Sequence, residues 1–180
     1  MSTADDARPA ARLTLLAGPA GAGKGGVVEL IRARSSVLWV SVPVTTRPRR
    51  PHEVDGVGHH FVDRAEFEAL VATDGLLEWD RYADHLYGTP VEPVRRRLRS
   101  GQPVLVALDL TGARRVRAAM PGSRLVCLVP PGAVPPTPEP PGESDIDLVV
   151  VNDFAERAAE ELVGLLGSSF LTPAQPRTSG

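Results

Sequence analysis

The sequence predicts an α/β fold in which a mostly parallel central sheet lies between two layers of helices. Its apolar segments are short and almost continuous, and stretches with helical spacing separate them. Strands that are apolar at every position are buried on both faces, as in the parallel sheets of α/β proteins. The chain has 180 residues, of which 42% are hydrophobic, enough for one ordinary domain with a substantial core. We expect a single domain over residues 12–171, with a flexible start (1–11) and a flexible tail (172–180).

The strands and helices are expected in a regular order. Apolar runs predict strands at residues 13–17, 37–42, 76–82, 103–109, 124–129 and 146–152. Helical spacing predicts helices at residues 24–34, 63–70, 91–99, 111–120 and 153–166, the second of which starts at the N-cap residue Asp63. Residues 87–90 contain Gly and Pro and are expected to turn into the third helix. Residues 58–87 break the alternation, which predicts a small mixed β insertion.

Composition and charge argue against several partners and locations. The formal net charge of −2 gives no basic excess, so neither a nucleic acid nor an anionic membrane is an expected partner. The arginine-rich stretches 95–99 and 114–117 leave a nucleic-acid patch open, but the net charge favours solvated helix faces. The single cysteine, Cys127, lies in an apolar run and predicts a buried thiol. The polar, acidic first residues do not resemble a signal peptide, and we expect a cytoplasmic monomer or homodimer.

Residues 18–25, GPAGAGKG, match the phosphate-binding loop pattern G-x-x-x-x-G-K (Walker A, or P-loop) through its first seven positions. The loop follows a predicted strand and opens a predicted helix, so its backbone N–H groups can turn toward phosphate oxygens. Lys24 is the only lysine among 20 basic residues. The alternative is a glycine-rich turn with a surface lysine. The expected triphosphate-binding residues are Gly18, Gly21, Ala22, Gly23, Lys24 and Gly25.

The eighth position of the loop departs from the pattern. A serine or threonine hydroxyl normally binds Mg²⁺ there, and this chain has Gly25. Glycine offers no side-chain ligand, so magnesium is expected to be held by other groups or to be held poorly.

Five further motifs follow the loop in order: TTRPRRPHEVDG (45–56), LLEW (76–79), YGTP (87–90), LDLTGA (108–113) and VVND (150–153). In this order and spacing they resemble the guanylate kinase family over about residues 12–166. The resemblance implies a three-layer P-loop fold with a GMP-binding insertion at about residues 44–90. It also implies phosphoryl transfer from ATP to GMP with the help of Mg²⁺.

The resemblance implies a role for each matching residue. Arg47, Arg50 and Tyr87 would bind the GMP phosphate, and forked guanidinium donors suit a dianion. Glu78 would accept hydrogen bonds from guanine, and Thr89 would contact the same base. Asp109 would lie beside the magnesium and the reacting phosphates, so Lys24 and Asp109 are the expected catalytic pair. If the resemblance is set aside, the arginines could be solvated residues of a surface loop, and Glu78 could be an exposed acid at the edge of a pocket.

Three positions depart from the family pattern in the acceptor pocket. Pro43 stands where a serine contacts the base, His59 where a tyrosine contacts the phosphate, and Ala107 where an acid contacts guanine. Each lost polar contact to a buried base edge typically costs about 1–3 kcal/mol. These changes predict an altered nucleotide preference, with His59 kept as a phosphate-binding candidate.

The family's arginine-rich lid over ATP is expected to be missing. Only the 13 residues 132–144 separate Pro131 from Asp145, and they form part of a proline-rich loop. No lysine or arginine lies between Arg124 and Arg157. Arginines that neutralise a transferring phosphoryl group can contribute 10³–10⁵ in rate.

These features leave three functions open. The first expectation is a guanylate kinase-like protein that binds nucleotide or a phosphorylated ligand, such as a phosphopeptide of a protein partner, with weak or no kinase activity. The alternative is an active kinase that transfers the γ-phosphate of ATP to GMP. A third candidate is a kinase of a related small phosphorylated substrate.

Overall fold

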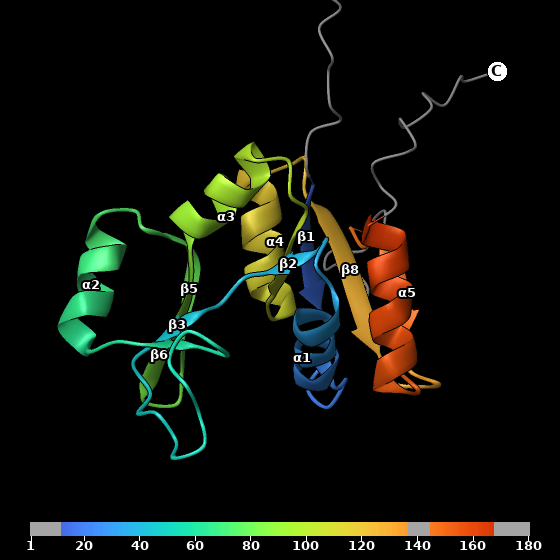
Figure 1. Cartoon of the computed structure of the whole chain (residues 1–180), viewed down its shortest axis with the longest axis horizontal. Coiled ribbons are helices and arrows are strands. Elements are labelled where there is room, and N and C mark those ends of the chain that lie inside the picture. Colours follow the sequence, from blue (N-terminus) through green and yellow to red (C-terminus); the bar gives the residue numbers. More distant parts are fainter. Residues whose placement is uncertain (1–11, 137–144, 168–180) are drawn as a thin grey trace, which may run out of the picture.

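The computed structural model describes residues 12–136 and 145–167. Two sheets lie side by side in it, a larger one that carries the core and a smaller one beside it (Figure 1). The larger sheet consists of β1 (Leu13–Ala17), β2 (Trp39–Val40), β7 (Val104–Ala107), β8 (Arg124–Val129) and β9 (Leu148–Val151). Its strand order is β2-β7-β1-β8-β9, and every pair is parallel.

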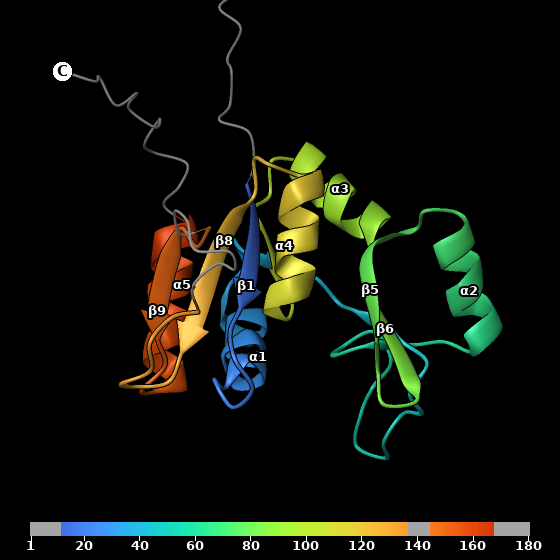
Figure 2. The same cartoon turned by 180° about the vertical axis from the view of Figure 1, so that it is seen from behind.

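Helices cover both faces of this sheet, as Figure 2 also shows. Helices α1 (Lys24–Arg34) and α5 (Ala155–Gly167) pack on one face, where Val27, Ile31 and Leu162 are buried against Leu16. Helices α3 (Val91–Arg99) and α4 (Leu110–Ala119) cover the other face, against alternate side chains of β1. The alternation follows from the pleat, which points successive side chains to opposite faces. This three-layer parallel architecture confirms the predicted fold class.

The smaller sheet consists of β4 (His60–Phe61), β3 (Val44–Thr45), β6 (His85–Pro90) and β5 (Leu76–Tyr82), in that order. β3 pairs with β4 in parallel and with β6 antiparallel, so the sheet is mixed, as predicted for this insertion. Helix α2 (Arg64–Ala72) packs on it through the fully buried Phe67. Asp63 caps α2 and forms a capping box with Glu66, which confirms the predicted N-cap.

Several predicted bounds are corrected by the structure. The strand expected at 37–42 pairs only at Trp39–Val40, because the chain then crosses to the smaller sheet. The strands expected at 103–109 and 146–152 shorten to β7 and β9, and the last helix begins at Ala155. The predicted turn at 87–90 is wrong, because these residues belong to β6 and pair with β5.

No helix in the part of the chain that the structure describes is long and apolar enough to cross a membrane. The proposed flexible ends 1–11 and 172–180, and residues 137–144 of the proline-rich connection, lie outside the described residues.

Candidate functional site

A cavity of about 950 Å³ opens between the two sheets. One wall comes from α1 and the carboxyl end of β7, and the other from the smaller sheet and the loop before β4. Ligands of α/β proteins bind at the carboxyl ends of parallel strands, where the strand order reverses. The cavity brings together these predicted site residues: Lys24, Gly25, Arg50, His59, Glu78, Tyr87, Thr89 and Asp109.

The phosphate loop connects β1 to α1, and close contacts require glycine at two of its positions, Gly18 and Gly23. A side chain at Gly18 would place a Cβ 2.2 Å from the carbonyl oxygen of Leu128. Gly23 has a left-handed backbone with φ of 76°, and a Cβ there would lie 2.5 Å from Nδ2 of Asn152. Gly23 caps α1 without a side-chain hydrogen bond, which leaves the first N–H groups of the helix for an anion.

Asn152 fixes this loop to the end of β9, because its Nδ2 donates to the carbonyl oxygen of Ala22 at 2.8 Å. Of the predicted triphosphate-binding residues, Lys24 and Gly25 line the cavity, whereas Gly18, Gly21, Ala22 and Gly23 do not.

Lys24 lies half-buried at the start of α1, and its Nζ donates to the carbonyl oxygen of Gly18 at 2.6 Å. Burial lowers the pKa of Lys24, and the nearby Asp109 partly offsets that effect. A partly desolvated ammonium group near a carboxylate can exchange this single backbone contact for phosphate oxygens.

The cavity offers few side chains that could bind a magnesium ion. Among residues 12–136 and 145–167, no group of three His, Cys, Asp or Glu side chains gathers as a metal site. Asp109 is the N-cap of α4, and its Oδ1 accepts from the N–H of Gly112 at 2.6 Å. Asp109 alone fits a magnesium ion that keeps waters and binds mainly to nucleotide phosphates. Gly25 contributes no ligand, but a Cβ there would meet nothing within 4 Å, so a larger side chain fits.

The loop after β3 is anchored by its two threonines. Thr45 donates through Oγ1 to the carbonyl oxygen of Leu86, and its Oγ1 accepts from the N–H of Arg47. The hydroxyl of Thr46 accepts from the N–H of Leu86 at 2.9 Å. These contacts fix the start of the arginine loop to β6, the strand that carries Tyr87.

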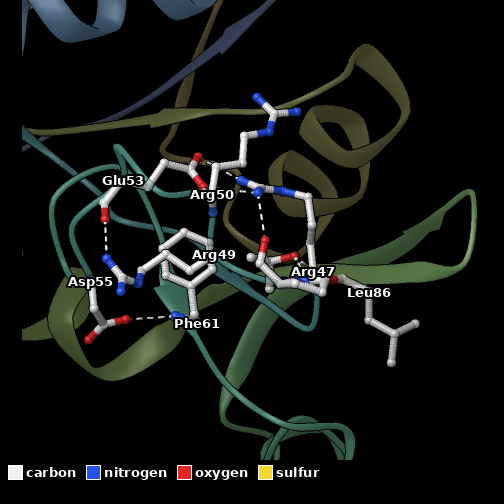
Figure 3. Close-up of polar contacts among 9 residues, drawn as sticks. Arg47, Arg49, Arg50, Glu53, Asp55, Phe61 and Leu86 are labelled. Atoms are coloured by element: carbon white, nitrogen blue, oxygen red, sulfur yellow. Dashed lines mark hydrogen bonds and ion pairs between the residues drawn. The ribbon is translucent and has the colours of Figure 1, made fainter.

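Glu53 organises the rest of this loop (Figure 3). Its carboxylate accepts two hydrogen bonds from the guanidinium of Arg47, at 2.8 and 2.9 Å, and one from the N–H of Arg50. Its carbonyl oxygen accepts from Arg49 at 2.6 Å. The hydrogen bonds to the carboxylate lower the pKa of Glu53 to about 2, with that from Arg47 as the main cause and that from the N–H of Arg50 second. Glu53 therefore stays ionised at any neutral or mildly acidic pH.

The two predicted phosphate-binding arginines consequently differ. Arg47 is engaged by Glu53 and by the carbonyl oxygen of Pro48, and it does not line the cavity. Arg50 lines the cavity, and its guanidinium points away from the Arg47–Glu53 pair in Figure 3. Arg50 is the better placed of the two to contact a phosphate directly.

His59 and Tyr87 lie next to each other on the same wall, with ring centroids 6.1 Å apart. Burial lowers the pKa of His59, and the positive charge of Arg47 lowers it further. The imidazole is therefore neutral near pH 7 and can be protonated when a dianion arrives.

The predicted base-contacting residues converge deeper in the cavity. Thr89 is buried and donates through Oγ1 to Oε1 of Glu78 at 3.2 Å. Burial raises the pKa of Glu78, an effect that the Thr89 hydrogen bond opposes. A Cβ at Gly112 would lie 3.0 Å from Oε2 of Glu78, so glycine leaves room for this carboxylate beside Asp109.

The three altered positions belong to the same cavity, since Pro43, His59 and Ala107 all line it. Sequence reasoning missed Glu53 and Arg32, which also line it. The motif TTRPRRPHEVDG contained the signal for Glu53, because an acid three residues after Arg50 can close a tight loop.

Comparisons with known proteins identify the family. The guanylate kinase family model matches residues 10–134. A guanylate kinase from Thermobifida fusca is 45% identical, with 87% of this chain and 91% of that protein covered. One from Frankia casuarinae is 42% identical, with 86% and 96% covered. The crystal structure of guanylate kinase from Anaplasma phagocytophilum superposes on this chain with a TM-score of 0.70. The superposition covers 91% of this chain and 88% of that one at 21% sequence identity, so the two proteins share a fold.

The alignment lengths indicate that some relatives have residues that this chain lacks. The alignment with the Thermobifida fusca protein is 179 positions long but uses 87% of 180 residues, about 157, so about 22 of its positions are unmatched here. A shorter alignment with a Gloeobacter violaceus guanylate kinase has 123 positions and uses 68% of the chain, about 122 residues, without such an excess. The family match ends at residue 134, inside the short proline-rich connection. With the phosphate loop, the acceptor motifs and these relatives in agreement, the chain belongs to the guanylate kinase family.

Proposed function

We propose that this protein transfers the γ-phosphoryl group of ATP to the phosphate of GMP, forming ADP and GDP. One observation carries the proposal: a single cavity joins Lys24 of the phosphate loop, Asp109 and the acceptor wall with Arg50, Tyr87 and Glu78. Relatives at 40–45% identity are named guanylate kinase, which supports an active enzyme over a binding protein.

The side chains divide the chemistry between them. Lys24 would hold the outer phosphates of ATP, while Arg50, Tyr87 and His59 would orient the phosphate of GMP. A phosphate oxygen of GMP forms the new bond to the γ-phosphorus, and the bond from that phosphorus to the bridging oxygen of ADP breaks. Such a transfer depends on positioning and on charge neutralisation rather than on covalent catalysis. Magnesium, when bound to the phosphates, adds to that neutralisation.

A nucleotide-binding protein with weak or no turnover is the second candidate. Gly25 offers no magnesium ligand, and the sequence has no basic residue between Arg124 and Arg157 to replace lid arginines. Pro43 and Ala107 line the cavity at positions where the family resemblance implies polar contacts to the base, which favours an altered base preference. These features predict slow turnover, and they leave phosphate binding intact.

Arg50→Gln tests the acceptor site. We expect this variant to bind GMP about 10–100-fold more weakly, on the scale of a charged hydrogen bond lost to a phosphate. Guanosine, which has no phosphate, should bind the variant and the parent protein equally. Isothermal titration calorimetry with both ligands measures this. Equal affinities of the parent protein for GMP and guanosine would remove this site from the proposal.

His59 predicts a pH dependence of GMP binding. Its pKa is lowered by burial and by the charges of Arg47, Arg32 and Arg50, and a bound dianion should raise it. Binding then takes up a proton, so affinity should increase as the pH falls from about 7.5 to 5.5. Glu53, ionised down to about pH 2, does not contribute there.

The matched control for this measurement is His59→Phe. The phosphate of GMP titrates near pH 6 in both experiments, so the ratio of the two affinities isolates the histidine. A ratio that stays constant over this pH range would rule out a phosphate contact by His59.

A further inference from the structure

Arg32 is a cation of the cavity wall that none of the motifs accounts for. It lies on α1, eight residues after Lys24, and the positions of Lys24, Val28 and Arg32 share one face of the helix. All three line the cavity between the sheets. Side chains of a helix lean toward its N-terminus, which in α1 is the end that joins the phosphate loop.

The structure leaves most of this guanidinium without partners. Its NH2 group donates to the carbonyl oxygen of Ser41 at 3.4 Å, which is longer than an ordinary N–H···O bond. Its Nε is buried and has no hydrogen-bond partner. No carboxylate in the described parts of the chain forms an ion pair with it. Burial lowers the pKa of Arg32, and the neighbouring charge of Glu29 only partly offsets this.

Such an arrangement costs free energy in the absence of an anion. Buried arginines are normally paired, since an unpaired charge loses solvation without compensation. Arg34, two residues later on the same helix, is exposed to solvent. The helix therefore has a position at which an arginine stays solvated, and Arg32 does not occupy such a position. The half-buried position of Arg32 is therefore explained best by an anion that occupies the cavity.

The facing wall indicates which anion. Arg32 lines the cavity from α1, and the acceptor-phosphate residues Arg50 and His59 line it from the loop before β4. The charge of Arg32 also contributes to the lowered pKa of His59. The guanidinium fork matches two oxygens of a phosphate group. A dianion between Arg32 and Arg50 would also satisfy the buried donor at Nε.

We propose that Arg32 is a phosphate-binding residue that contacts the phosphate of the acceptor nucleotide from the wall opposite Arg50. The inference rests on the proposed function, because it assigns a contact within the same acceptor site. Arg32 thereby supplies from the phosphate-loop helix some of the positive charge that the sequence lacks between Arg124 and Arg157. The acceptor phosphate is held between the two halves of the molecule.

The test compares Arg32→Gln with Arg34→Gln, which removes the same charge from an exposed position of the same helix. GMP and guanosine are titrated into both variants, Arg50→Gln and the parent protein by calorimetry. We expect Arg32→Gln to weaken GMP binding at least about tenfold and to leave guanosine binding unchanged, because only the phosphate contact is lost. Arg34→Gln should match the parent protein for both ligands.

Each outcome separates this inference from the proposed function. If Arg50→Gln loses the preference for GMP and Arg32→Gln keeps it, Arg32 does not bind the phosphate and the acceptor site stands. Equal loss of GMP and guanosine binding in Arg32→Gln would mean a structural role, through the Ser41 contact. A parent protein with no preference for GMP over guanosine would overturn both proposals. If Arg32→Gln does not fold, Arg32→Lys keeps the charge but loses the fork, and it should still weaken GMP binding relative to Arg34→Lys.

Discussion

Replacing Lys24 by alanine is expected to reduce the rate of GDP formation at least about a hundredfold, the scale of one preorganised donor lost from a transition state. Lys24 is the only lysine of the chain, and it lies where the phosphate loop meets both α1 and the cavity. Its ammonium group, which donates to the carbonyl oxygen of Gly18, would move to the outer phosphates of ATP. A coupled assay for ADP measures the rate, and calorimetry measures the accompanying loss of ATP affinity.

Arg34→Ala is the control for this variant, because it removes a positive charge from an exposed position on the same helix. Lys24→Arg adds a second comparison. A bulkier planar group should not replace the compact ammonium, so it should recover little of the rate. Unchanged ATP affinity and rate in a folded Lys24→Ala protein would show that this loop does not bind the triphosphate.

Adding arginines at residues 132–144 and a hydroxyl at position 25 should raise the turnover rate, and we expect this to be the largest effect of any variant. Residues 132–144 are replaced by a longer segment that carries arginines, and Gly25 is changed to serine. We expect the turnover rate to rise on the order of 10³-fold, as for arginines that neutralise a transferring phosphoryl group. The serine should fit without strain, since a Cβ at Gly25 would meet nothing within 4 Å and its φ is not left-handed.

Matched variants assign the gain to its cause. Gly25→Ala and Gly25→Ser both replace a glycine that weakens the first turn of α1, but only serine adds a hydroxyl. A higher turnover rate of the serine variant than of the alanine variant would therefore indicate a magnesium contact. A glycine–serine segment of the same length as the graft carries no arginine. An equal rate with that segment would show that charge is not what the short connection lacks.

Sequence reasoning located the parts of the site that depend on local backbone chemistry. The loop at residues 18–25 was predicted because a glycine-rich turn between a strand and a helix is typical of phosphate binding, and Gly18 and Gly23 do make close contacts that exclude side chains. Asp63 was predicted as a cap for a similar reason: the pattern and its physical cause lie within four residues. The parallel sheet followed from continuous apolar strands.

Contacts between distant segments were beyond such reasoning. Residues 87–90 contain Gly and Pro, typical of a turn, yet Gly88 lies inside β6, where a Cβ would come within 2.8 Å of Leu76. The turn between β5 and β6 instead uses Ala83, with φ of 52°. Arg32 is one of 19 arginines, and the sequence does not distinguish it from Arg34; its burial and its place in the cavity wall do.

Phosphoryl transfer to GMP is the central claim, and product formation tests it most directly. A ³¹P NMR time course with equal amounts of ATP and GMP, excess Mg²⁺ and the unmodified protein follows both nucleotides at once. We predict that ADP and GDP appear together in equal amounts, and that the Lys24→Ala protein forms both at least about a hundredfold more slowly. Binding of GMP without any GDP formation above the uncatalysed background would contradict the claim and leave a nucleotide-binding protein.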